Sequence, residues 1–186
     1  MRNIKLTIEY NGTGFSGWQA QMNKRTIQQT LENTLKELFR ENIKVAGSGR
    51  TDAGVHAICQ VANFRIKHTI ALDSLQKALN SRLPKDIVIT GAEEARKNFH
   101  SRFDAKSKVY RYTILNRAYP SALLKDNVCF YPHKLDINLM RKAAKSLLGR
   151  RDCKPFCNSA SDTKDTIRTI KRIDIKKEKK VLYILI

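Results

Sequence analysis

The chain has 186 residues, enough for one large domain or two small ones with a sizeable hydrophobic core. It carries 36 lysines and arginines against 17 acidic residues, and the resulting net charge of +19 is spread along the whole sequence. A surface this positive favours a polyanionic partner, with nucleic acid ahead of an anionic membrane, and argues against a protein that binds no polyanion.

The first half of the chain, residues 3–93, predicts the element order β-α-β-β-α-β. Alternating apolar residues predict a strand at 3–10, and the helix after it begins with a capping box formed by Thr26 and Gln29. This order is that of a ferredoxin-like unit, a layout that RNA-recognition modules also use. The other elements are a helix at 26–39, strands at 42–48 and 58–67, a helix at 72–83 that Pro84 ends, and a strand at 86–92.

The second half follows a polar junction at 94–106 and predicts the order β-α-β-β. It looks like the first half repeated without its last helix and strand, so we place the two halves at 1–106 and 107–186. The final "VLYILI" is apolar at every position, which indicates a strand buried on both faces rather than an edge strand. The elements are a strand at 108–116, a helix at 136–149 between Asp136 as N-cap and Gly149 as stop, and strands at 166–175 and 181–186 joined by a turn at 176–180.

The cysteines and the N-terminus point to a cytoplasmic protein. Cys153 and Cys157 are spaced C-x3-C with no second pair nearby, so no zinc site is expected. We interpret all four cysteines, with Cys59 and Cys129, as free thiols of a protein in a reducing compartment. The opening residues alternate like a strand and lack the apolar run of a signal peptide. No stretch could span a bilayer, so we expect no membrane partner.

The stretch "GSGRTDAGVHA" (47–57) places Arg50 and Asp52 in a glycine-flanked loop between two predicted strands. A carboxylate in such a loop can be held by the strands on either side and still reach a bound ligand. Arg50 is close enough in sequence to pair with Asp52 and keep it ionised. A phosphate-binding loop is not favoured, because no G-K-S/T follows. Spacing alone favours a plain surface turn over a catalytic Asp.

Three stretches resemble the motifs of the TruA family of tRNA pseudouridine synthases. "GRTDAGVHA" (49–57) matches that family's signature, and "YNGTGFSGWQ" (10–19) resembles its opening Y-D-G-x-x-F-x-G-W-Q. "FHSRFDAKSKVYRY" (99–112) resembles its F-H-x-R-F-x-A-x-x-K-x-Y-x-Y. The motifs occur in the family's order over essentially the whole chain, so the resemblance favours a catalytic Asp52 over a turn residue.

The resemblance implies an α+β fold whose core is two ferredoxin-like halves joined into one extended sheet. It implies that uridine is isomerised to pseudouridine in the tRNA anticodon stem-loop, with no cofactor and no metal. By similarity, Asp52 is the essential carboxylate, with Arg50 beside it in the catalytic motif. Whether Asp52 attacks the sugar, adds to the base or removes a sugar proton stays open. We also expect a homodimer.

The candidate substrate-binding residues are Tyr110, His100 and Arg102. Tyr110 matches the family's active-site Tyr, which could stack on an extruded uracil or take its C5 proton, although a Tyr alternating with Tyr112 on a strand is also typical of a core. His100 and Arg102 could contact the tRNA backbone, with surface packing as the equal alternative. Trp18 could stack on RNA, but a lone Trp more often anchors a core.

The chain departs from the family pattern in three places. Asn11 stands where Asp is usual, and "RDCKPF" (151–156) replaces the common H-D-F-x-x-F, which suggests relaxed packing there. Family members also continue beyond the position of Ile186 into a further helix and strand. We therefore expect the 186-residue chain by itself to be loosely packed and nearly inactive. The alternative function is a truncated, non-catalytic basic tRNA-binding protein.

Overall fold

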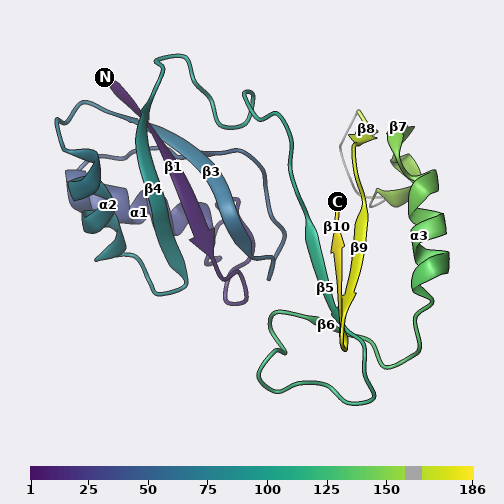
Figure 1. Ribbon diagram of the computed structural model, residues 1–186. Coiled ribbons are helices and arrows are strands. Elements are labelled where there is room, and N and C mark those ends of the chain that lie inside the picture. The colour runs from purple at the N-terminus through teal and green to yellow at the C-terminus, as the bar shows by residue number, and fades with distance from the viewer. Residues whose placement is uncertain (158–164) are drawn as a thin grey trace. The chain divides into compact units, whose positions relative to one another are not determined.

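The computed structural model describes residues 1–157 and 165–186 and divides the chain into two compact units, Met1–Lys106 and Ser107–Ile186 (Figure 1). Both units combine helices with mostly antiparallel strands, so the predicted α+β class is confirmed. Each unit is built around one four-stranded sheet.

The first unit has the predicted element order β-α-β-β-α-β. Its sheet runs in the order β2-β3-β1-β4, and every neighbouring pair is antiparallel. The first strand therefore lies at the centre of the sheet, between the third and fourth. The elements are β1 (Arg2–Tyr10), α1 (Ile27–Phe39), β2 (Ala46–Gly47), β3 (Ala57–Ile66), α2 (Leu72–Asn80) and β4 (Ile87–Ala95).

The core of the first unit lies between the sheet and the two helices, which cover one of its faces (Figure 1). Alternate residues of β1 point into this core, and the apolar stripes of both helices meet them, which is what the two sequence periods require. Each buried Leu or Ile stabilises the fold by about 1.5–3 kcal/mol. Trp18 is 2% exposed within this core, so its interpretation as a core anchor is confirmed. The fully buried side chains include Ile4, Leu6, Ile8, Leu31, Leu35, Leu75 and Leu79.

Three local predictions in this unit meet different outcomes. Thr26 caps α1 as predicted, because its side chain accepts a hydrogen bond from the main-chain N–H of Gln29. The predicted second helix is too long, since α2 ends at Asn80 and the chain turns before Pro84. The strand predicted at 42–48 is reduced to Ala46–Gly47. Val45 explains this loss, because its N–H and C=O bond to Glu32 and Gln28 of α1 instead of a strand.

The second unit contains a sheet in the order β6-β5-β10-β9 and a separate two-stranded ribbon, β7-β8. Helix α3 lies against β9, where the Arg141 guanidinium donates to the main-chain oxygen of Ile175 at 2.9 Å. Asp136 caps α3 as predicted, accepting from the N–H groups of Asn138 and Leu139. The elements are β5 (Arg111–Leu115), β6 (Cys129–Phe130), α3 (Ile137–Ser146), β7 (Gly149–Asp152), a short 3-10 helix (Lys154–Phe156), β8 (Ile167–Ile170), β9 (Asp174–Glu178) and β10 (Val181–Leu185).

The end of the chain differs from its predicted form in two respects. The strand predicted at 166–175 is two strands, β8 and β9, and each pairs with a different partner. The turn predicted at 176–180 is only Lys179–Lys180, with Lys179 at a φ of 53°. β10 is an internal strand, as predicted. The prediction that it is buried on both faces is wrong, because Leu182 alone in this strand is fully buried.

Candidate functional site

The loop that carries Asp52 lies directly against the loop of the N-terminal motif, "YNGTGFSGWQ" (10–19). Two main-chain hydrogen bonds join them, from Trp18 N–H to the oxygen of Thr51 (3.0 Å) and from Gly54 N–H to the oxygen of Phe15 (3.2 Å). The phenol of Tyr10 adds a hydrogen bond to the Thr51 hydroxyl at 2.8 Å. Motifs separated by some thirty residues in sequence thus form one backbone-paired structure. We refer to residues 11–18 as the support loop and to residues 48–56 as the Asp52 loop.

Glycines make this close approach possible. A Cβ at Gly17 would lie 2.5 Å from the oxygen of Thr51, and Gly17 has a φ of +87°, which L side chains rarely adopt. A Cβ at Gly12 would overlap the main-chain oxygen of Val55. Both obstacles are backbone atoms of the Asp52 loop, so neither glycine can be replaced without moving that loop.

The Asp52 loop is also held where it leaves the sheet. The buried side chain of Gln60, on β3, donates to the main-chain oxygen of Gly49 at 2.5 Å and accepts from the Ser48 hydroxyl at 2.9 Å. Burial raises the pKa of the Tyr10 phenol against the opposing effect of its hydrogen bond to Thr51, so Tyr10 stays protonated at neutral pH. The backbone around Asp52 is therefore fixed by contacts on several sides.

Asp52 and Arg50 themselves are exposed at the surface of this fixed loop. The expected ion pair between them is not formed: within residues 1–157 and 165–186, neither side chain has a hydrogen bond or ion pair. An exposed pair of this kind is worth only about 0–1 kcal/mol, which does not offset the entropy of fixing both side chains. The carboxylate of Asp52 is thus available to a ligand rather than engaged by the protein.

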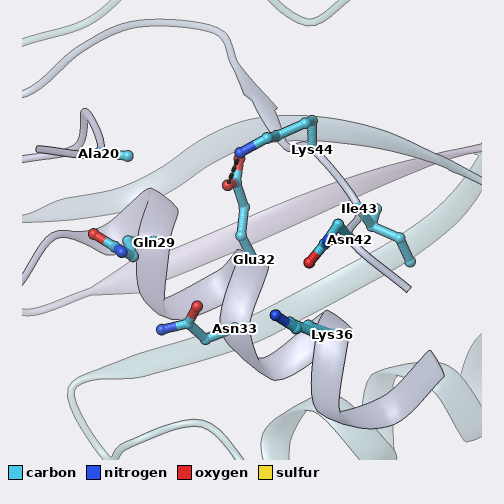
Figure 2. A pocket seen from close by; sticks show the side chains of 8 residues that line it. All are labelled: Ala20, Gln29, Glu32, Asn33, Lys36, Asn42, Ile43 and Lys44. Atoms are coloured by element: carbon cyan, nitrogen blue, oxygen red, sulfur yellow. Dashed lines mark hydrogen bonds and ion pairs between the residues drawn. The ribbon is translucent and has the colours of Figure 1, made fainter. Parts of the chain in front are cut away.

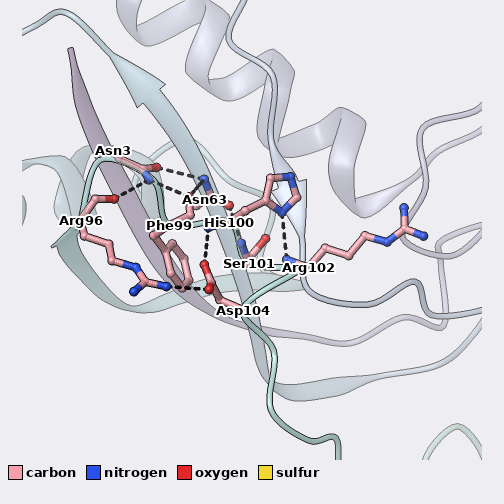
Figure 3. Close-up of polar contacts among 8 residues, drawn as sticks. All are labelled: Asn3, Asn63, Arg96, Phe99, His100, Ser101, Arg102 and Asp104. Carbon is pink, nitrogen blue, oxygen red and sulfur yellow. Dashed lines mark hydrogen bonds and ion pairs between the residues drawn. The ribbon is translucent and has the colours of Figure 1, made fainter. Parts of the chain in front are cut away.

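The third motif is tied to β2 and β3, the strands on either side of the Asp52 loop, and Figure 3 shows its contact with Asn63 of β3. The Ser101 hydroxyl donates to the main-chain oxygen of Ala46 at 2.7 Å, and its N–H donates to the Asn63 side chain at 2.9 Å. Asn63 in turn donates to Asn3 at 2.9 Å, and both Asn side chains are buried. Sequence reasoning missed these two residues, although two Asn inside apolar strands were the available signal.

His100 and Arg102 lie in the same segment and have different environments. The His100 N–H donates to Asp104 at 2.8 Å, and its ring Nδ1 accepts the Arg102 N–H at 3.2 Å while packing against the Phe103 ring. The His100 N–H, followed by the nearby Arg96 charge, lowers the pKa of the Asp104 carboxyl. His100 therefore takes part in local packing, whereas the side chain of Arg102 is exposed. Phe103, 77% exposed, is a surface aromatic that sequence reasoning missed.

Tyr110 belongs to the second unit, immediately before β5. Its main chain pairs with Ile186 through two hydrogen bonds of 2.9 Å, which extends the pairing of β5 with β10. The side chains of Tyr110 and Tyr112 are 50% and 57% exposed. The interpretation of these rings as core residues is therefore wrong, and both offer an aromatic face at the surface of their sheet.

A surface hollow of about 400 Å³ lies elsewhere, along α1 (Figure 2). Across it, Lys44 forms an ion pair with Glu32 at 3.0 Å, and Glu32 also accepts the N–H of Val45. These contacts fasten the segment before β2 to the helix, which is a structural role. None of the three motifs contributes to its lining, made by Ala20, Gln29, Glu32, Asn33, Lys36, Asn42, Ile43 and Lys44.

Two further properties concern the part of the chain that the structure describes. No group of three or more His, Cys, Asp or Glu side chains in it is arranged to hold a metal ion. None of its helices is both long and apolar enough to cross a membrane.

Comparison with known proteins gives one consistent result. The family model described as tRNA pseudouridine synthase matches residues 6–104 and 143–186. The chain is 48% identical over 170 residues to tRNA pseudouridine synthase A of Caldicellulosiruptor bescii, covering 91% of this chain and 70% of that protein. It is 45% identical over 182 residues to tRNA pseudouridine synthase A of Acetivibrio thermocellus, covering 98% and 75%. It is 46% identical over 178 residues to tRNA pseudouridine synthase A 2 of Clostridium perfringens, covering 96% of this chain and 73% of that protein. The chain belongs to the tRNA pseudouridine synthase family.

Proposed function

We propose that this protein isomerises uridine to pseudouridine in the anticodon stem-loop of tRNA, with Asp52 as the essential carboxylate. The proposal is carried by the exposed carboxylate of Asp52, which has no hydrogen bond or ion pair within the described residues and lies on a loop whose backbone is fixed by the support loop and by Gln60. Catalysis needs a reactive group held within a fraction of an ångström of its working position and still open to substrate, and the Asp52 loop meets both needs.

The reaction conserves the atoms of the nucleotide. The bond from N1 of the base to the sugar breaks, the base turns, C5 forms a bond to the sugar and loses its proton, and N1 gains one. An ionised Asp52 can attack the sugar, add to the base or remove a sugar proton. Arg50, two residues away and also exposed, supplies positive charge beside the reacting uridine.

Substrate binding in this proposal uses charge and aromatic stacking. A uridine inside a stem must be extruded before it can react, and the exposed ring of Tyr110 is suited to stack on the extruded base. Arg102 and His100 contact the tRNA backbone, and Arg102 is the better placed because its side chain is exposed. The net charge of +19 supplies the general attraction to the polyanion.

The finer architecture is part of the same proposal. We assign a ferredoxin-like layout to each of the two halves, 1–106 and 107–186. Two strand orders support this, because β1-β3-β2 in the first unit corresponds to β5-β10-β9 in the second. We further propose a homodimer acting in the cytoplasm, consistent with four free cysteines.

The test is the formation of pseudouridine in a defined RNA. Unmodified tRNA transcripts are incubated with the chain and with an extended chain, in which Ile186 is followed by the residues that follow the matched region in the Acetivibrio thermocellus relative. Pseudouridine confined to the anticodon stem-loop is the expected product. If neither form makes pseudouridine although both bind tRNA, the protein is a non-catalytic tRNA-binding protein and the proposal is wrong.

A further inference from the structure

Arg25, which precedes α1 and lies outside the three motifs, makes three contacts with the support loop. Its guanidinium carbon lies 4.0 Å from the centre of the Phe15 ring, a cation–π contact. Its Nη1 donates to the main-chain oxygen of Gly14 at 3.3 Å. Its own main-chain oxygen accepts the N–H of Ser16 at 2.8 Å. One residue therefore holds three consecutive positions of the support loop.

Asp86, just before β4, completes this clamp. Its carboxylate accepts from Nη2 of Arg25 at 3.2 Å, and its main-chain oxygen accepts the N–H of Asn11 at 2.9 Å. The support loop is thus fixed near its start by Asp86 and in its middle by Arg25, and the Arg25–Asp86 pair links the two points of attachment.

The clamp connects to the Asp52 loop through Phe15 and Gly54. Phe15, whose ring Arg25 covers, is 4% exposed, and its main-chain oxygen accepts the N–H of Gly54 at 3.2 Å. Gly54 is two residues from Asp52 in the same fixed loop. A change in the position of Phe15 is therefore passed directly to the backbone that carries the carboxylate.

We infer that Arg25 is a positioning residue for Asp52, acting through Phe15 and Gly54; this inference rests on the proposed catalytic role of Asp52. The contacts depend on the shape of the guanidinium, because a flat group must cover a ring while two of its nitrogens reach separate acceptors. A Lys ammonium keeps the charge but cannot reproduce this arrangement.

Arg25 is also about half exposed, at 49% of its side chain, so a direct contact with a tRNA phosphate is the competing explanation. The two explanations predict different results. A phosphate contact needs mainly positive charge, so Lys would largely replace Arg, and its loss would weaken tRNA binding and lower the salt dependence of that binding. A positioning role needs the planar group, so Lys and Gln would both lower turnover at saturating tRNA.

The experiment compares Arg25→Lys and Arg25→Gln with the matched control Lys24→Gln, which removes the neighbouring positive charge without touching the support loop. The variants are made in whichever form, the chain or the extended chain, produces pseudouridine. We measure single-turnover rates at saturating tRNA, the tRNA Kd at several salt concentrations, and hydrogen exchange of the Gly54 amide. We expect both Arg25 variants to lose about tenfold in rate, since small misplacements of a catalytic group are costly. The Kd of Arg25→Lys stays within about twofold of wild type, because the charge is retained. The Gly54 amide exchanges faster in both Arg25 variants, and Lys24→Gln keeps the wild-type rate.

Asp86→Asn supplies a second, independent variant. It removes a negative charge, so a purely electrostatic view predicts equal or tighter tRNA binding and unchanged turnover, whereas positioning predicts about threefold slower turnover from the weakened clamp. Wild-type rates in all Arg25 and Asp86 variants, with an inactive Asp52→Asn, would overturn the inference and leave the proposed function intact. An active Asp52→Asn would overturn both.

Discussion

Replacing Gly17 with Ala tests whether the support loop sets the position of Asp52. A Cβ at this position would lie 2.5 Å from the oxygen of Thr51 and 3.1 Å from the carbonyl carbon of Asp52. Ordinary van der Waals contact begins at 3.4 Å, so the two loops must separate by about 0.9 Å. Both obstacles are backbone atoms, which cannot rotate away as a side chain would.

The cost in stability has two parts. Holding Ala at a φ of +87° costs about 1–2 kcal/mol, and forcing a methyl group against packed backbone costs about 1–3 kcal/mol more. Gly54→Ala is the matched control, because its φ is +78° but a Cβ there meets nothing within 4 Å. Urea unfolding should therefore give a loss of about 2–5 kcal/mol for Gly17→Ala and only the first part for Gly54→Ala.

The cost in activity follows from the displacement. A misplacement of about 1 Å lowers turnover by about 100-fold, so Gly17→Ala should lose about that much at saturating tRNA while still binding it. Gly149→Ala, at another positive φ in the second unit with open space around it, should keep its turnover. Equal unfolding free energies for Gly17→Ala and Gly54→Ala, together with wild-type turnover, would refute the idea that the support loop positions Asp52.

Four further outcomes are expected. Asn63→Ala leaves buried partners on Asn3 and Ser101 unpaired, so urea unfolding should reveal a loss of about 1–3 kcal/mol for each. Asp104→Asn should be less stable than wild type at neutral pH, because the native state lowers the pKa of this carboxyl below its ordinary value of 3.8. In unfolding measured as a function of pH, the difference in stability between the two proteins should disappear as the pH falls below 3.8 and Asp104 becomes protonated. Tyr110→Phe should bind tRNA like wild type, and only a loss of turnover would assign a proton transfer to its hydroxyl, whereas Tyr110→Ala should impair both. The Kd for tRNA should rise steeply with salt concentration. A Kd that does not change with salt would mean that the basic surface is not the tRNA-binding surface.

The sequence was most informative where periodicity and capping act locally. The alternation of Ile4, Leu6 and Ile8 and the cap at Thr26 predicted β1 and α1, because both signals are set by near neighbours in the chain. The predicted strand at 42–48 was mostly lost, because Val45 bonds to side chains of α1 that lie far away in sequence. Tertiary contacts of this kind leave no local pattern.

The candidate site was only partly accessible to the same reasoning. Asp52 and Arg50 could be selected from their motif, but the ion pair expected between them is absent from the described residues, since both side chains are exposed and unconstrained. The contacts of the support loop with Thr51 and Gly54 depend on folding and could not be deduced from spacing. Arg25 carries no motif signal and is identified by its contacts with Phe15, Gly14 and Asp86 in the folded chain.

The most direct test of the account is the turnover of Asp52→Asn, measured by pseudouridine formation in tRNA alongside tRNA affinity. The substitution keeps the shape of the side chain, which is exposed and has no protein partner in the described part of the chain, so folding and binding should be unchanged. We expect no detectable pseudouridine and a wild-type Kd for tRNA. Substantial turnover by Asp52→Asn would contradict it.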